Sequence, residues 1–231
     1  LRPRMHLQHV LRLNHVRKIV NEMIPAARVS AAIEALEDVE ARRRPVADAL
    51  KDWGLTHRFA GSKDRAAIAN HVYDALRLRE SSRWIMGQTT ARATVLGSLG
   101  RARGLDVEAV AALFNGQGHA PALLTDAERA RLAAASLDGA PLHVAADIPE
   151  WLEPAFAAAF GENAAAEAAA LSGRAPVDLR VNLIKTTRDK ALEQLAHLGA
   201  QPTLLSPVGL RVPLGLDGRA PALSAEPTYV K

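Results

Sequence analysis

The stretch from residue 64 to residue 77 reads DRAAIANHVYDALR, and its pattern sets the fold class of the first half of the chain. Ala69, Val72 and Leu76 recur at the three- and four-residue spacing of one helix face. Ser62 stands just before this stretch, where a serine is a suitable N-terminal cap. The pattern therefore predicts an amphipathic helix whose apolar face packs against other helices.

Similar helical patterns run from about residue 28 to residue 137. A first helix from Arg28 is expected to end at the triplet Arg42, Arg43 and Arg44, which Pro45 follows. The residues that we expect to cap or close the further helices are Ser62, Gly54, Thr90, Gly104, Asp106 and the pair Thr125 and Glu128. This half of the chain is predicted to be helical throughout.

Beyond residue 137 the pattern changes. Residues 137–148 carry turn-forming Asp, Gly and Pro, and they are expected to link two domains or to form a long loop within one. Two helices are predicted at about 150–160 and 164–172. Alternating apolar residues from Val177 to Leu183 then predict a half-buried strand.

A helix follows that strand in the pattern, capped by Thr187 and closed by Gly199. Further short strands are expected at 204–205 and 210–212, so a β-α-β unit begins near residue 177. Because such a short mixed element would lack a complete sheet, we expect a further domain downstream of Lys231.

The predicted fold class is mainly α, with an all-helical bundle followed by a small α/β (β-α-β) subdomain. The predicted boundaries are 28–140 for the bundle and 141–231 for the subdomain. Residues 1–27 are expected to be a leader, and residues 1–22 are either native or an upstream extension of a protein that starts at Met23.

Composition excludes several classes of site. The 231 residues include no cysteine, which rules out disulfides, thiolate metal ligands and a cysteine nucleophile. No apolar run approaches the roughly 18 residues of a membrane-spanning helix, and the basic start lacks the apolar core of a secretory signal. His6 and His9 are three residues apart and His15 is close, but no carboxylate or cysteine supports a metal site there. We expect a cytoplasmic, monomeric protein without a metal site.

Charge is distributed unevenly along the chain. Residues 1–104 hold 19 Lys and Arg against 10 Asp and Glu, a net charge of +9. Residues 105–231 hold 10 against 15, a net charge of −5. The first part is therefore the one suited to a polyanion such as RNA.

Two segments resemble a known family. Residues 64–77 resemble the D-R-x-x-hydrophobic-x-x-x-V-Y-x-x-L-R helix of the NusB-like domain, which occurs in the antitermination factor NusB and at the front of Sun-type ribosomal RNA cytosine methyltransferases. Residues 148–152 (IPEWL), with residues 179–185 (LRVNLIK), resemble the P-x-W-L and L-R-V-N-x-x-K segment just before the catalytic domain of those methyltransferases. Free NusB lacks this second segment. The two matches in this order cover about residues 28–215.

The resemblance implies the substrate-recognising N-terminal region of an enzyme that methylates carbon-5 of a cytosine in small-subunit ribosomal RNA. The complete enzyme would bind S-adenosylmethionine on a Rossmann-like domain and use two cysteines. This sequence has no cysteine and no glycine-rich turn after a strand, so we expect no catalytic or cofactor-binding residue and no activity from the chain alone. Two alternatives are a free-standing NusB-type antitermination factor and a helical scaffold whose basic face only aids solubility.

The candidate RNA-binding residues of the first half are all cations. They are Arg42, Arg43, Arg44, Lys63, Arg65 and Arg77. Such side chains suit phosphate contacts that add affinity without sequence preference. The triplet could instead be a solvated helix end, Lys63 an ordinary exposed loop residue, and Arg77 a structural partner of Asp74 or Glu80.

Two further candidates lie in the second half. Arg180 and Asn182 share one face of the predicted strand and could hydrogen-bond a base edge or a ribose, or could fix the strand against a neighbouring loop. Trp53, Trp84 and Trp151 have apolar neighbours at helical spacing, so we expect them to anchor cores rather than to stack on bases.

Overall fold

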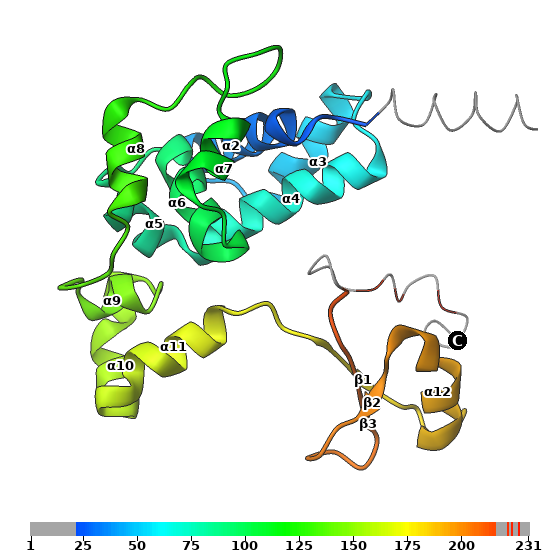
Figure 1. Cartoon of the computed structure of the whole chain (residues 1–231). Coiled ribbons are helices and arrows are strands. Elements are labelled where there is room, and N and C mark those ends of the chain that lie inside the picture. The colour runs from blue at the N-terminus through cyan, green and yellow to red at the C-terminus, as the bar shows by residue number, and fades with distance from the viewer. Residues whose placement is uncertain (1–21, 216–220, 222, 224–225, 227–231) are drawn as a thin grey trace, which may run out of the picture. The chain divides into compact units, whose positions relative to one another are not determined.

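The computed structural model describes residues 22–215, 221, 223 and 226 (Figure 1). Its contacts divide the chain into two compact units, residues 1–172 and residues 173–231. The first unit is helical and the second contains a small sheet with one α-helix. The predicted fold class, a helical bundle followed by a small α/β subdomain, is confirmed.

The first unit contains ten α-helices among its described residues. They are α2 (Pro25–Arg42), α3 (Val46–Thr56), α4 (Ser62–Arg77), α5 (Arg79–Met86), α6 (Ala91–Arg103), α7 (Val107–Leu113), α8 (Asp126–Ala133), α9 (Leu142–Ala145), α10 (Glu153–Phe160) and α11 (Ala164–Ser172). Two 3-10 turns, η1 (Glu150–Leu152) and η2 (Gly161–Asn163), flank α10.

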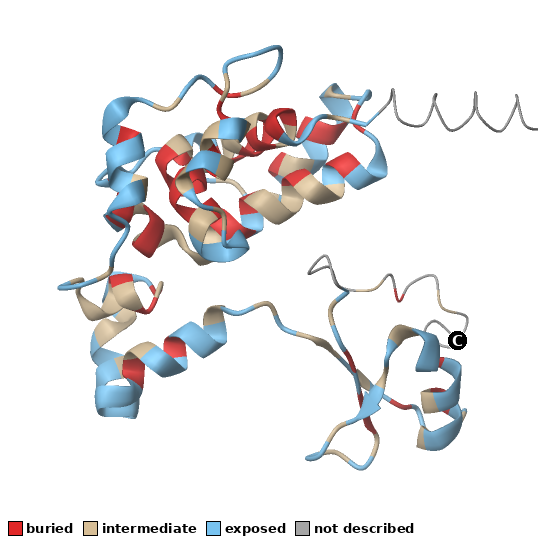
Figure 2. Cartoon of the chain, in the orientation of Figure 1, coloured by how far each residue is buried: buried red, intermediate tan, exposed pale blue. Residues whose placement is uncertain are grey.

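Helix α6 lies at the centre of the bundle, and its residues 93–99 are all buried (Figure 2). Small side chains let the neighbouring helices approach it closely. A β-carbon on Gly97 would lie 2.7 Å from the Cα atom of Ser82 on α5, so only glycine fits at this contact. The sequence of α6 is therefore set by packing on all sides rather than by one apolar face.

The bundle begins earlier than its sequence pattern predicts. The helix expected from Arg28 starts at Pro25, because Ala26 and Ala27 are buried and Met23 packs against the main core. Residues 23–27, which the sequence assigns to the leader, are thus part of the bundle. Residues 1–21 lie outside the described residues.

Three predicted N-terminal caps of the bundle are confirmed, and Gly104 closes α6 in the left-handed conformation as predicted. Thr90 accepts a hydrogen bond from the third backbone N–H of α6, and Asp106 does the same for α7. Thr125 and Glu128 form the predicted capping box of α8. Glu128 also accepts hydrogen bonds from Arg92, at 2.7 and 3.0 Å, and these bonds lower the pKa of its carboxyl below the usual value.

Two predicted caps are wrong. Gly54 lies inside α3, which ends at Thr56 with His57 as its cap. A β-carbon on Gly54 would lie 2.9 Å from Cδ of Arg65, so the glycine serves packing and not capping. Ser62 is the first residue of α4, and Gly61 is the cap. The carboxylate of Asp64 accepts the backbone N–H of Gly61 at 3.3 Å and so takes the role predicted for the serine.

Residues 142–147 contact the helical bundle. Helix α9 contacts α5, and the buried carboxylate of Asp147 accepts hydrogen bonds from the backbone N–H and hydroxyl of Ser81, at 2.8 and 2.7 Å. Arg101 pairs with the same carboxylate at 2.7 Å. The contacts of the chain divide into compact units after Ser172. The domain boundary at residue 140 stays a prediction.

The second unit is a three-stranded antiparallel sheet with a helix on one face. Its elements are β1 (Val177–Arg180), α12 (Arg188–Gln194), η3 (Ala196–Leu198), β2 (Gln201–Pro202) and β3 (Gly209–Val212). Strand β3 lies between β1 and β2 and pairs antiparallel with both. The outer strands are consequently parallel to each other, so β1-α12-β2 is a split β-α-β unit. Val181, Ala191, Leu195 and Leu210 form its core.

The strand predicted at 204–205 is wrong, because Leu204 and Leu205 lie fully exposed in the turn between β2 and β3. A backbone hydrogen bond from Thr203 to Gly209, at 3.0 Å, closes that turn. Likewise β1 ends at Arg180 instead of continuing to residue 183. Leucine content alone does not distinguish these exposed turns from strands.

Candidate nucleic-acid interface

The three arginines at the end of α2, Arg42 to Arg44, differ in their exposure and in their partners. Arg44 is mostly buried and pairs with Asp38 and Asp52, at 3.3 and 2.5 Å, which ties the end of α2 to α3. Its hydrogen bond lowers the pKa of the Asp52 carboxyl and raises the pKa of the Arg44 guanidinium. Arg42 pairs with Asp38 at 2.8 Å but stays exposed. Arg44 is therefore a structural residue.

Arg43 differs from its two neighbours. It closes α2 in the left-handed conformation, with a φ of 49°, and its side chain is exposed. Among the described residues it forms no ion pair, so its guanidinium is available to a phosphate.

A groove of about 490 Å³ lies between α2 and α3, beside this triplet. Four acidic residues line it together with Arg42 and Arg44, and these are Glu34, Glu37, Asp38 and Asp52. Carboxylates at this density repel phosphate groups. The groove is accordingly an unfavourable path for a nucleic-acid backbone.

The turn between α3 and α4 and the first residues of α4, residues 57–65, carry three exposed cations, and we call this segment the α3–α4 corner. Arg58 and Arg65 are exposed, and the side chain of Lys63 is 69% exposed. The one acid in this range, Asp64, is buried and pairs with Arg28 at 2.8 Å. The corner thus presents three cations and no exposed carboxylate of its own.

The chain also enters the bundle at the α3–α4 corner. The backbone N–H of Met23 donates to Asp64 at 3.2 Å, and Glu22 lies 3.6 Å from the ammonium group of Lys63. Five more Lys and Arg residues precede this point in the sequence, between residues 2 and 18. The described part of the chain therefore begins at this corner.

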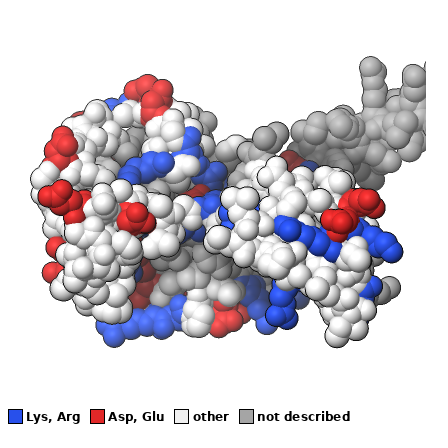
Figure 3. Space-filling view, turned by 90° about the horizontal axis from the view of Figure 1, so that it is seen from below, with Lys and Arg blue, Asp and Glu red and all other residues white. Residues whose placement is uncertain are grey.

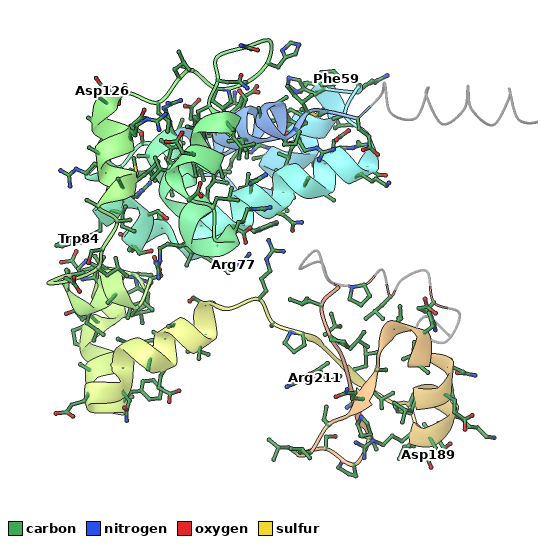
Figure 4. The ribbon with its side chains drawn as sticks, viewed as in Figure 1. Phe59, Arg77, Trp84, Asp126, Asp189 and Arg211 are labelled. Carbon is green, nitrogen blue, oxygen red and sulfur yellow. The ribbon has the colours of Figure 1, made fainter. Side chains whose placement is uncertain are left out.

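Arg77 lies at the other end of α4, about 21 Å from Lys63 at 1.5 Å per helical residue. It pairs with the buried Asp74 at 2.5 Å, and Arg103 approaches the same carboxylate at 3.1 Å (Figure 4). These contacts fit the structural interpretation of Arg77. In Figure 3 the Lys and Arg side chains likewise lie in separate groups with acidic residues beside them.

The sheet of the second unit has an open face that carries polar side chains. Asp178 and Arg211 pair across β1 and β3 through two contacts of 2.7 Å, which lower the pKa of the Asp178 carboxyl. Arg180 is exposed opposite Gly209, which has no side chain, and no ion pair to Arg180 occurs among the described residues. Arg180 is thus available to a ligand on this face.

Asn182 does not share that strand face, contrary to the prediction. It begins the turn after β1, where its side-chain oxygen accepts the backbone N–H of Ile184 at 3.1 Å. Its own carbonyl accepts from the backbone N–H groups of Lys185 and Thr186. Asn182 therefore fixes the turn that follows β1.

The tryptophans only partly follow the prediction. Trp53 is buried and bonds Glu34 at 3.0 Å, so it anchors the core as expected. Trp84 and Trp151 are 42% and 77% exposed, which contradicts the prediction for both. Helix α5 buries its residues 81, 82, 85 and 86, so position 84 faces outward (Figure 4). Sequence reasoning also overlooked Phe59, which is 66% exposed in the α3–α4 corner.

Neither a metal-binding cluster nor a membrane span is found in the described part of the chain. No group of three or more His, Asp or Glu side chains there could hold a metal ion. None of its helices is both long enough and apolar enough to cross a bilayer.

Comparison with protein families gives a match for one segment of the chain. Residues 148–217 match the family model of the ferredoxin-like domain of RsmF/B-like methyltransferases. This segment resembles a methyltransferase domain. The match includes α10, α11 and the whole split β-α-β unit, the arrangement on which ferredoxin-like folds are built. No curated protein matches the chain.

Proposed function

We propose that this chain is the RNA-recognising N-terminal region of an S-adenosylmethionine-dependent ribosomal RNA cytosine-5 methyltransferase. The observation that carries the proposal is the match of residues 148–217 to the ferredoxin-like domain of RsmF/B-like methyltransferases. The helical bundle that precedes this segment contains the NusB-like sequence of residues 64–77 on α4. We further propose that the protein is a cytoplasmic monomer whose partner is small-subunit ribosomal RNA.

The cations that the fold leaves available support an RNA-binding role. Arg43, Arg58 and Arg65 in the bundle and Arg180 on the sheet are exposed. Lys63 is exposed too but lies 3.6 Å from Glu22, and Arg44 and Arg77 are held by carboxylates. Each phosphate that such a cation neutralises releases bound counterions, so affinity falls steeply with salt. The α3–α4 corner is the first surface that we expect to contact the RNA backbone.

The described residues do not fit the methyl donor. Strand β1 is followed by the turn Asn182–Thr186, which is not glycine-rich and leads to α12 only after Thr187. A dinucleotide-type cradle needs glycine at that point for close backbone approach. The sequence also lacks the two cysteines that the family chemistry uses. We therefore assign cofactor binding and methyl transfer to a part of the enzyme outside these 231 residues.

RNA binding can be tested by fluorescence anisotropy with labelled small-subunit ribosomal RNA fragments at 50 and 200 mM salt. The double variant Lys63→Glu, Arg65→Glu is expected to bind at least about tenfold more weakly and with a shallower salt dependence. Lys190→Glu makes the same type of charge change on α12, which packs on the other face of the sheet, and is expected to keep its affinity. Absence of binding at 50 mM salt would refute the proposal.

A free-standing NusB-type factor is the main alternative. The match of residues 148–217 weighs against it, because free NusB has no such extension. The genomic reading frame after codon 231 separates the two. A continuation with a glycine-rich motif and with Pro-Cys and Thr-Cys motifs supports the methyltransferase, and an immediate stop codon supports the factor.

A further inference from the structure

Phe59 is a large apolar side chain held on the outside of the bundle, in the α3–α4 corner (Figure 4). Its neighbour Ala60 is buried, and the backbone N–H of Ala60 donates to His57 at 3.0 Å. The turn that carries Phe59 is therefore anchored on both sides. A ring held in this way loses little conformational freedom when a ligand binds to it.

Phe59 is the outermost of three aromatic rings in contact, and the innermost ring, Trp53, lies in the core. The Trp53 and His57 rings are stacked, with centroids 4.2 Å apart and planes 10° apart. The His57 ring meets the Phe59 ring edge to face at 5.7 Å. Nδ1 of His57 lies 2.9 Å from the carbonyl oxygen of Trp53, and this contact fixes the imidazole between the other two rings. The inner side of Phe59 is thus supported while 66% of the residue remains exposed.

The charges around Phe59 suit a nucleotide better than an apolar protein surface. Arg58, Lys63 and Arg65 are exposed in the same nine-residue corner, and its one acid is buried. A nucleotide needs a flat apolar contact for its base and a cation for its phosphate, a few ångströms apart. The corner supplies an exposed ring and exposed cations within nine residues of the chain.

We propose that an unpaired nucleotide of the RNA stacks its base on Phe59, so that the α3–α4 corner selects single-stranded RNA over duplex RNA. The inference deepens the proposed RNA-binding function and rests on it. In a duplex the base faces are covered by neighbouring bases, and the deep, narrow major groove of A-form RNA excludes side chains. Only a loop, a bulge or a single strand can offer a free base face to Phe59.

The test compares two fluorescently labelled probes with the full chain, a 12-nucleotide oligouridine and a blunt RNA duplex of the same number of phosphates. Wild-type protein is expected to bind the single strand more tightly. Phe59→Ala is expected to weaken binding of the single strand by roughly 5- to 150-fold, the range of base–aromatic stacking, and to leave duplex binding nearly unchanged. Phe59→Trp keeps a flat ring and should retain the affinity.

Leu55→Ala is the matched control, because Leu55 is 57% exposed near the end of α3 but has no ring. Equal binding of both probes by wild type, or an unchanged Kd in Phe59→Ala, overturns this inference and leaves RNA binding intact. A loss in Leu55→Ala as large as that in Phe59→Ala also overturns it, because binding would then depend on apolar surface in general and not on a ring that stacks on a base. Binding to neither probe refutes the proposed function and, with it, this inference.

Discussion

Asp147 is expected to hold residues 141–172 to the helical bundle, and its removal provides a test of that contact. Its side chain is only 2% exposed, and it accepts the backbone N–H of Ser81, in the first turn of α5, at 2.8 Å. Leu78, the residue at the cap position of α5, offers no side-chain hydrogen bond. Asp147 thus caps α5 from 66 residues away along the chain.

Three effects determine how far Asp147→Ala lowers the free energy of unfolding. The capping bond contributes about 1 kcal/mol. Arg101 loses its carboxylate, which costs about 3–5 kcal/mol for a fully buried pair but less here, because its side chain is 30% exposed to water. Alanine also tolerates the φ of 51° at this position less well than aspartate. We expect the free energy of unfolding to fall by about 3 kcal/mol.

Urea unfolding followed by circular dichroism measures this change. With a slope of about 2 kcal/mol per molar urea, the midpoint is expected to fall by about 1.5 M. Amide hydrogen exchange at Ser81 should accelerate in Asp147→Ala, because its partner is gone. Asp138→Ala, an exposed aspartate in the same connecting segment, is the control and should change stability by less than about 0.5 kcal/mol. An Asp147→Ala midpoint equal to that of the control would refute the capping argument.

Three further predictions concern stability. Gly97→Ala places a methyl group 2.7 Å from α5 and should destabilise the bundle by about 1–3 kcal/mol. In the control Gly100→Ala the new methyl group meets nothing closer than 3.5 Å, so this variant should be neutral or stabilising. Thermal unfolding distinguishes the two, and equal melting temperatures would contradict the packing argument. The hydrogen bonds from Arg92 lower the pKa of Glu128 in the folded state, so its contribution to stability is present above the unfolded pKa of about 4.3 and is lost as the pH falls through the folded pKa. The gap in urea midpoint between wild type and Glu128→Gln should therefore narrow as the pH falls below about 4.3, and a gap independent of pH would count against this contribution. Arg44→Glu should lower the melting temperature, because Arg44 pairs with Asp38 and Asp52. Arg43→Glu should leave the melting temperature unchanged, and an equal loss in both variants would show that Arg43 is structural as well.

Local chemistry made much of the fold predictable. Thr90, Asp106 and the Thr125–Glu128 pair cap helices as their sequence positions indicate, because a cap depends on residues three positions apart. The split β-α-β unit was visible only in part. Alternation revealed β1, but β2 is two residues long and carries no periodic pattern.

The candidate site was less predictable, because its availability depends on distant partners. Arg43 and Arg44 are adjacent in sequence, yet one is free for a ligand and the other is held by Asp52 on the next helix. Asp147 meets Ser81 across 66 residues, which no local pattern reveals. The exposure of Phe59 follows from the path of a turn, and turn geometry was not predicted there.

Photo-crosslinking of the chain to 4-thiouridine-labelled small-subunit ribosomal RNA, with mass spectrometry of the peptides, tests the central claim most directly. The RNA-recognition account predicts crosslinks within residues 57–65, including Phe59, and on the open sheet face near Arg180. These crosslinks should diminish with added unlabelled RNA and with salt. Crosslinks confined to the acidic groove between α2 and α3, or no crosslinks at low salt, would contradict the account.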